Sequence, residues 1–361
     1  MDMVTGIALP STYRVVTAKS ASNQPGAPRC FSTSRRLALL QLGGIVMPQA
    51  QKVFVEMGGK KLARAEESNG IFGDIAQAAT IPTPEEDVLQ WAKNDNRKLL
   101  HVVYCVGDLD KTIKFYTECL GMKLLRRRDI PSEKYGNAFL GYGPEETNFA
   151  IELTYNYGVD KYKIGTGFGH IGIAVDNVVK VVDLINAKGG KLIRKVGSVN
   201  GDNSITACIE DPNGYPFEIL ERKTPSPEPL RQVMLRVGDL DRSTKYYENA
   251  FGMKLLQRQD YPDYKYTTAT MSYGDEDKNT VLKLTYNYGV KEYDKGNGYA
   301  QMAIGTDDVY KTAQAIKKSG GKITREPAPV PGINTKITAC EDPDGWRSVF
   351  VDNIDFAKEM T

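Results

Sequence analysis

Two histidines and two glutamates are the residues of this chain whose types and spacing could hold a metal ion. His101 and His170 are the only histidines among its 361 residues. Glu152 follows His101 after 51 residues (152 − 101), and Glu218 follows His170 after 48 residues (218 − 170). Two imidazoles and two carboxylates suit an open octahedral ion such as Ni²⁺ or Co²⁺, with Zn²⁺, Mn²⁺ or Fe²⁺ as alternatives.

Such a centre predicts acid–base chemistry at a carbon atom. An open divalent ion polarises a substrate oxygen and stabilises an enediolate, and a carboxylate that can leave the ion is a suitable base for a carbon acid. Both glutamates lie in apolar stretches, F-A-I-E-L and P-F-E-I-L, where burying an unpartnered carboxylate is costly. The sequence contains no P-loop, nucleophile elbow or dinucleotide-binding fingerprint.

The elements that must position these residues form a repeated βαβββ unit. The pattern predicts a strand over Leu99–Val106, a helix over Asp108–Leu120 and then three strands. The order recurs with a strand over Gly169–Val175, a helix over Val179–Lys188 and a last strand over Tyr215–Leu220. Each histidine then lies on a first strand and each glutamate on a last strand. Because these strands can lie side by side, each histidine is expected close to its glutamate.

The second half of the chain repeats the first. V-G-D-L-D begins at residues 106 and 237, G-M-K-L-L at 121 and 252, and L-T-Y-N-Y-G-V at 153 and 284, each pair 131 residues apart. A repeat this sharp indicates an α+β protein with four βαβββ units in two tandem domains. We expect domain 1 over residues 81–222, a proline-rich linker over 223–229 and domain 2 over 230–355.

Adding 131 to the four ligand candidates gives Gln232, Lys283, Gln301 and Val349 in the copy. Every ligand type has changed while the surrounding strand sequence survives, and Lys283 would repel a divalent ion. We therefore predict that units one and two face each other inside domain 1 and form one complete site. Pairing unit one with unit four, and unit two with unit three, would leave only two candidates at each site.

The start of the chain has the composition of a targeting segment. Residues 1–36 carry five basic residues and one acidic residue, a net charge of +4 in a chain of formal charge +2. The remainder is therefore at 2 − 4 = −2, which argues against nucleic acid as a partner. A start rich in Ser, Thr and Arg and poor in acid is typical of a chloroplast transit peptide. We expect residues 1–80 to be a transit peptide and flexible leader that directs the chain to the stroma, with the thylakoid lumen as the alternative.

Cysteine usage and hydropathy predict a reduced, soluble protein. The five cysteines form no C-x-x-C spacing and are odd in number, which favours mostly buried, reduced thiols over a disulfide framework. The apolar run over Leu37–Ala50 is too short to span a bilayer, so we expect no membrane partner. The fused copy supplies internally the partner that a dimer would provide, which favours a monomer.

Residues 97–222 resemble a complete bacterial-type glyoxalase I (lactoylglutathione lyase) of the vicinal-oxygen-chelate superfamily. The matching motifs include L-L-H, V-G-D-L-D, L-G-M-K-L-L, I-E-L-T-Y-N-Y-G-V, G-H-I-G-I-A-V-D and E-D-P-N-G-Y. Residues 230–355 resemble a degenerate second copy, and the whole resembles the two-domain chloroplast enzymes of plants. The resemblance implies isomerisation of the hemithioacetal of methylglyoxal and glutathione to S-D-lactoylglutathione. It also implies one divalent metal per chain, with Ni²⁺ or Co²⁺ favoured over Zn²⁺, and glutathione as co-substrate.

The resemblance assigns roles to the four candidates and to one further residue. His101, Glu152, His170 and Glu218 match the metal ligands of the family. Glu218 matches the catalytic base that shuttles the proton, and Glu152 matches its catalytic counterpart on the other face. Asn156 matches a residue that contacts glutathione, and His170 is expected to border the substrate as well.

One family feature is displaced in this chain. The family places an arginine four residues after the first ligand, where it binds a carboxylate of glutathione. This chain has Cys105 there, while the copy keeps Arg236 and Asn287 at the equivalent positions. Glutathione must therefore be held partly differently.

Two other functions are consistent with the scaffold. An extradiol-type dioxygenase needs two histidines and one carboxylate on iron, with further acid–base histidines, and this chain has no third histidine. The other alternative is a non-catalytic metal- or ligand-binding protein.

Overall fold

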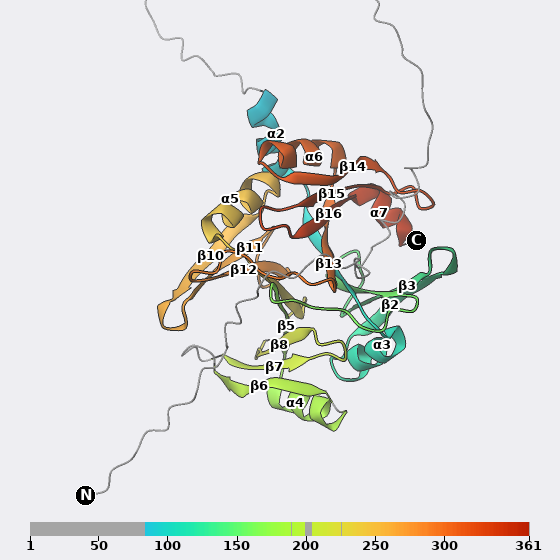
Figure 1. Ribbon diagram of the computed structural model, residues 1–361, viewed down its shortest axis with the longest axis vertical. Helices are drawn as coiled ribbons and strands as arrows, with labels where there is room; N and C mark the ends of the chain where they lie inside the picture. Colours follow the sequence, from blue (N-terminus) through green and yellow to red (C-terminus); the bar gives the residue numbers. More distant parts are fainter. Residues whose placement is uncertain (1–83, 189, 199–203, 225, 361) are drawn as a thin grey trace, which may run out of the picture.

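The computed structural model describes residues 84–188, 190–198, 204–224 and 226–360 (Figure 1). The leader predicted over residues 1–80 lies outside these residues. The described chain begins with helix α2 (Pro84–Asn94) and ends with helix α7 (Asn353–Glu359). No helix of the described part is long and apolar enough to cross a membrane.

The four predicted βαβββ units are present. Unit 1 consists of β1 (Lys98–Cys105), α3 (Leu109–Glu118), β2 (Lys123–Ile130), β3 (Tyr135–Gly141) and β4 (Ala150–Asn156). Unit 2 consists of β5 (Phe168–Val175), α4 (Val178–Ala187), β6 (Lys191–Ser198), β7 (Ile205–Glu210) and β8 (Pro216–Glu221). Unit 3 consists of β9 (Leu230–Arg236), α5 (Leu240–Ala250), β10 (Lys254–Tyr261), β11 (Tyr266–Ser272) and β12 (Val281–Asn287). Unit 4 consists of β13 (Tyr299–Thr306), α6 (Val309–Lys318), β14 (Lys322–Pro329), β15 (Lys336–Glu341) and β16 (Arg347–Asp352).

The same local chemistry begins the helix of every unit. An Asp or Asn precedes each helix, and its side chain accepts a hydrogen bond from a backbone N–H of the first turn, which is a stabilising N-cap. The four capping residues are Asp108, Asn177, Asp239 and Asp308. Each helix then buries its apolar face on the sheet of its own unit.

The units pair across the two halves of the chain, so the predicted pairing of units one and two is wrong. One eight-stranded sheet has the order β14-β15-β16-β13-β1-β4-β3-β2, and the other has the order β10-β11-β12-β9-β5-β8-β7-β6. Unit 1 joins unit 4 through the antiparallel pair β1–β13, and unit 2 joins unit 3 through β5–β9. Figure 1 shows the second sheet with β5–β8 (yellow-green) beside β9–β12 (orange).

The glycines around His170 explain why β5 accepts unit 3 as its neighbour. A Cβ atom on Gly172 would lie 2.5 Å from Cγ of Gln232, and one on Gly169 would lie 2.2 Å from Sδ of Met234. Both glycines are therefore needed for the close approach of β5 to β9. The motif G-H-I-G therefore has two roles. It contains His170, and its glycines allow β5 to pair with unit 3.

The segment before β1 is also bound to the second half. Arg97 forms a fully buried ion pair with Asp95 at 2.8 Å and donates to the carbonyl of Ala250 and to the hydroxyl of Thr312, both at 3.0 Å. A buried guanidinium satisfied in this way fixes the register of unit 1 against units 3 and 4.

The cysteines agree with the prediction with one exception. Cys119, Cys208 and Cys340 carry free thiols. Cys105, by contrast, is disulfide-bonded. The expectation of reduced thiols is therefore wrong for Cys105, because the spacing of cysteines in a sequence does not show which residues meet in space.

Candidate metal centres

The strand registers give the two halves of the chain identical frameworks. All partners in the parallel pairs β1–β4 and β9–β12 differ by 131 residues, and so do all partners in β5–β8 and β13–β16. Lys283 on β12 thus occupies the place that Glu152 occupies on β4. In the same way Val349 on β16 occupies the place of Glu218 on β8.

The cross-pairing divides the four predicted ligands between two places. We call His101, Glu152, Gln301 and Val349 the first centre, and His170, Glu218, Gln232 and Lys283 the second centre. His101 and Glu152 lie in one sheet and His170 and Glu218 in the other. Among the described residues no group of three or more His, Cys, Asp or Glu could hold a metal ion. The predicted single centre made of all four residues is therefore wrong, although each histidine does lie beside its own glutamate.

The first centre is buried and contains a close histidine–glutamate pair. His101 Nε2 lies 3.4 Å from Glu152 Oε2, and the amide of Asn137 donates to Glu152 Oε1 at 2.8 Å. The ring of Phe139 packs edge-on against the imidazole at 5.3 Å between centroids. Burial pushes the pKa of Glu152 upward, but the contacts with His101 and Asn137 outweigh it and leave the pKa below its ordinary value. The fourth position is filled by Val349, which offers no ligand atom.

Helix α7 borders the first centre. A cavity of about 380 Å³ beside His101 and Glu152 is lined by Phe356 and Glu359 of this helix. The ring of Phe356 lies 6.2 Å from that of His101, and Glu359 forms an ion pair with Arg128 at 3.5 Å. The C-terminal end of the chain therefore covers part of this centre.

The second centre brings three potential ligand atoms together. His170 Nε2 lies 3.2 Å from Glu218 Oε2. The amide nitrogen of Gln232 lies 2.7 Å from His170 Nε2 and 3.2 Å from Glu218 Oε2. Two metal–ligand bonds of about 2.1 Å at right angles place their ligand atoms about 3 Å apart. A half-turn of the Gln232 amide exchanges its nitrogen for its oxygen. The three groups therefore fit three neighbouring positions of an octahedral ion.

Positive charge surrounds the carboxylate of the second centre. Arg194 Nη2 lies 3.1 Å from Glu218 Oε1. Burial pushes the pKa of Glu218 upward, but His170, Lys283 and Arg194 together hold the pKa at about 2. The fourth position of this centre carries the cation Lys283. An ammonium group is not a metal ligand, so this one position does not fit a metal ion.

The glutathione residues implied by the resemblance also fall at both centres. Near the first centre Asn156 is buried, and its amide donates to the hydroxyl of Tyr162 at 2.8 Å. Near the second, the amide of Asn287 donates to the hydroxyl of Tyr293 at 2.9 Å. Arg236 is half-buried on β9, four residues beyond Gln232, and donates to the carbonyl of Thr166 at 2.8 Å.

Gln232 is the candidate that sequence reasoning misses. In the sequence it stands as a lost ligand, because the copy has an amide in place of an imidazole. An amide oxygen is nevertheless a metal ligand, as in calcium sites. The signal that could have found it is the preservation of a polar side chain of similar length at both copied histidine positions, Gln232 and Gln301.

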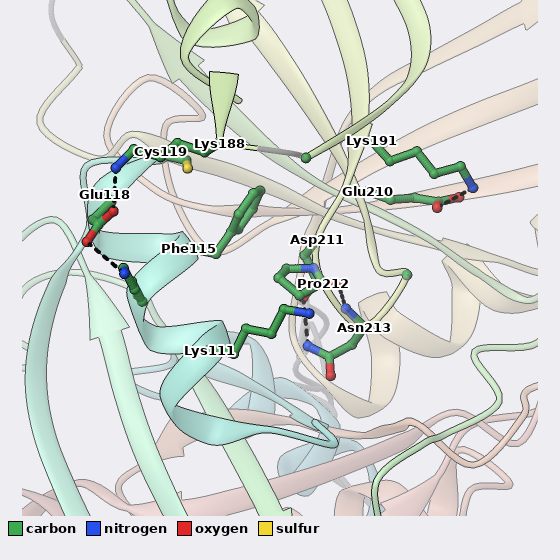
Figure 2. A pocket seen from close by; sticks show the side chains of 13 residues that line it. Lys111, Phe115, Glu118, Cys119, Lys188, Lys191, Glu210, Asp211, Pro212 and Asn213 are labelled. Carbon is green, nitrogen blue, oxygen red and sulfur yellow. Dashed lines mark hydrogen bonds and ion pairs between the residues drawn. The ribbon is translucent and has the colours of Figure 1, made fainter. Parts of the chain in front are cut away.

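A further cavity, of about 650 Å³, lies outside both centres, between α3 and the turn after β7 (Figure 2). Its lysines are largely paired, as Lys188 with Glu118 at 2.7 Å and Lys191 with Glu210 at 2.5 Å. None of the eight centre residues lines it.

The fold and both centres have counterparts among known proteins. The profile of the Glyoxalase/Bleomycin resistance protein/Dioxygenase superfamily matches residues 98–219 and 230–350. The chain therefore belongs to this superfamily. The two matches confirm the predicted tandem repeat.

Within the superfamily its relatives are glyoxalase I proteins. It is 63% identical to a probable chloroplastic lactoylglutathione lyase of Arabidopsis thaliana, over 96% of this chain and 99% of the relative. It is 62% identical to a lactoylglutathione lyase of Oryza sativa, over 79% of this chain and 100% of the relative. The crystal structure of glyoxalase I from Zea mays is 64% identical with a TM-score of 0.73, over 75% of this chain and 98% of that one. The predicted resemblance to two-domain glyoxalase I is confirmed.

Proposed function

We propose that this chain is a lactoylglutathione lyase and that the reaction takes place at the second centre. It isomerises the hemithioacetal of methylglyoxal and glutathione to S-D-lactoylglutathione and so detoxifies methylglyoxal. The identity to lactoylglutathione lyases over nearly the whole chain supports the activity. The observation that carries the choice of site is the cluster of His170, Glu218 and Gln232, whose ligand atoms lie 2.7 to 3.2 Å apart.

Glu218 acts as the base in this proposal. Its carboxylate is ionised at neutral pH, so it can accept the proton from the carbon that bears sulfur and return it to the neighbouring carbon. The carbon-bound proton moves from the first carbon to the second, and the hydroxyl proton moves from the oxygen of the first carbon to the oxygen of the second. No atom is gained or lost, so the isomerisation needs no other reactant. Glu152 lies in the other sheet, so it takes no part in this proposed transfer, contrary to the role that the resemblance implies for it.

The family uses a divalent metal, and His170, Glu218 and Gln232 are the residues that would hold it. When bound, such an ion supplies polarisation of the substrate oxygens and stabilises the enediolate. One ion per chain is proposed, with Ni²⁺ or Co²⁺ favoured by the mixed nitrogen and oxygen ligands and Zn²⁺ as the alternative.

Arg236 and Asn287 are the proposed contacts for glutathione. Both lie on the strand pair β9–β12 that also carries Gln232. The guanidinium of Arg236 can bind a carboxylate through two parallel hydrogen bonds. At the first centre the equivalent of Arg236 is the fully buried Cys105, which offers no charge. We therefore propose Asn287, and not Asn156, as the asparagine that contacts glutathione.

The cellular setting is inferred from the relative and from the composition of the leader. A chloroplast location, in the stroma rather than the thylakoid lumen, fits the acid-poor start of the chain. A monomer fits the internal pairing of units, since every unit already has its partner within the chain.

The test is an assay of the full chain, depleted of metal and then restored with Ni²⁺, Co²⁺ or Zn²⁺. Methylglyoxal plus glutathione should yield the S-D-lactoyl thioester, and the Glu218→Gln variant should not. Absence of thioester with every divalent ion would remove the lyase proposal. Consumption of a catechol with Fe²⁺ would instead favour the dioxygenase.

A further inference from the structure

Lys283 stands where the framework of the fold calls for a ligand. The registers of β1–β4 and β9–β12 coincide after a shift of 131 residues, so Lys283 has the same place relative to Gln232 that Glu152 has relative to His101. At the first centre this geometry brings a carboxylate to 3.4 Å from the imidazole. The equivalent side chain at the second centre is an ammonium group on a half-buried strand position.

The net charge of the second centre opposes the binding of a divalent ion. Glu218 supplies one negative charge, while Arg194 and Lys283 supply two positive charges, so these three side chains sum to +1. Lys283 lies close enough to lower the pKa of the Glu218 carboxylate. A divalent ion that binds here gains one anionic ligand, Glu218, and is repelled by two cations, Arg194 and Lys283. Like charges repel more strongly in a partly buried site than in water.

We propose that Lys283 is the residue that sets the metal affinity of this chain. The second centre holds its ion through His170, Glu218 and Gln232 alone, and Lys283 weakens the binding. The ammonium group has a flexible stem that can withdraw toward solvent, so binding is reduced and not abolished. Replacing Lys283 by glutamate completes a four-ligand set of one imidazole, one amide and two carboxylates. The inference rests on the proposed location of the active site.

The experiment measures metal binding and does not depend on catalysis. Ni²⁺ is titrated calorimetrically into the metal-free full chain and into three variants. Lys283→Glu adds a ligand and removes the cation, Lys283→Met removes only the cation, and Lys254→Glu makes the same charge change at the exposed start of β10. Changing a group next to a metal ligand alters affinity by about 10- to 100-fold. We expect Lys283→Met to bind Ni²⁺ about 10-fold more tightly, and Lys283→Glu about 100-fold or more, with Lys254→Glu unchanged.

Visible absorption after Co²⁺ binding gives a second readout. The spectrum reports the ligand set, so Lys283→Glu should change the Co²⁺ bands while Lys254→Glu leaves them as in the parent chain. Equal Ni²⁺ affinity for the parent chain and Lys283→Glu would overturn the inference. So would an equal gain for Lys283→Glu and Lys254→Glu, since this would be an effect of net charge.

The same samples separate this inference from the proposed function. If Lys283→Glu binds Ni²⁺ tightly but neither it nor the parent chain forms thioester, the role of Lys283 stands and the lyase proposal fails. If the parent chain forms thioester and Lys283→Glu changes neither affinity nor spectrum, the lyase proposal stands and the role of Lys283 fails.

Discussion

The two centres have the same three polar residue types and differ at the fourth position. Each combines one histidine, one glutamate and one glutamine, contributed by two units from different halves of the chain. The first centre adds the neutral Val349 and the second adds the cation Lys283. The first half therefore supplies one histidine and one glutamate to each centre, and the second half supplies one glutamine and one altered residue to each. Divergence of the copy has changed both centres, and neither centre belongs to one half alone.

The centres differ as well in the segment that comes after their last strand. After β16 the chain forms helix α7, which packs beside His101. The equivalent residues after β8, obtained by subtracting 131, are 222–228, and these form the connection to β9. The helix beside the first centre thus has no equivalent at the second centre, where the chain leads on to the next unit.

The largest expected effect separates the two glutamates. Glu218→Gln should lower kcat by about 1,000-fold or more, because loss of a general base alone costs about 10² to 10⁴-fold and a metal ligand is weakened as well. Glu152→Gln should leave kcat within about threefold, since the first centre takes no part in the proposed reaction. Steady-state kinetics with Ni²⁺ measures both, and metal content per chain is the companion readout. A loss for Glu152→Gln as large as that for Glu218→Gln would mean that both centres react.

The next effect concerns Arg236. Arg236→Met should raise KM for the hemithioacetal by about 10- to 100-fold, because a hydrogen bond to a charged group contributes about 1.5 to 3 kcal/mol. The value of kcat should change little, since the contact is remote from the reacting carbons. Arg236→Lys should restore part of the loss, because it keeps the charge without the two-pronged geometry. Arg242→Met, which removes an exposed cation paired with Asp344, is the matched control and should leave KM unaltered.

The sequence predicts the repeated unit of this chain but not the way in which the units pair. The unit, its order and its repeat are predictable, because strand periodicity, four equivalent helix caps and three repeated motifs are all local or collinear signals. The partner of each unit is not predictable from the sequence. The observed pairing divides the four ligand candidates between two sites, and from the sequence alone this division counts against that pairing. The informative residues are Gly169 and Gly172, whose missing side chains make room for β9. A glycine reports a close neighbour without identifying it.

A smaller effect is expected at the two asparagines. Both donate to a tyrosine hydroxyl, Asn156 to Tyr162 and Asn287 to Tyr293, so each substitution by alanine removes a similar hydrogen bond. Asn156→Ala also removes the contact of the amide with Cys105 Sγ at 3.4 Å. Asn287→Ala should raise KM about fivefold, corresponding to about 1 kcal/mol for a neutral hydrogen bond. Asn156→Ala should alter only the free energy of unfolding. Kinetics and urea unfolding of both variants separate the roles, and a higher KM for Asn156→Ala would return the glutathione site to the first centre.

The smallest effect concerns the ion pairs that hold α7 in place. Lys336 bridges Asp352 at 2.7 Å and Asp355 at 2.8 Å, and the hydrogen bond from Lys336 is the main reason that the pKa of Asp355 is lowered to about 2. A carboxylate with a lowered pKa in the folded state contributes stability above the ordinary pKa, which is lost as pH falls from about 4 to 2. Because Lys336 is one-third exposed, the contribution is at most about 1 kcal/mol.

Hydrogen exchange of the α7 amides measures this effect locally. Lys336→Met should speed exchange in α7 by up to about fivefold at pH 7, the equivalent of about 1 kcal/mol, and the difference from the parent chain should shrink toward pH 2. Lyase activity should not change, since α7 borders only the first centre. Lys322→Met, which removes an exposed pair with Glu341 on β15, is the matched control and should leave α7 unaffected. If loosening α7 instead altered the activity, the covered centre would have to be coupled to the reacting one.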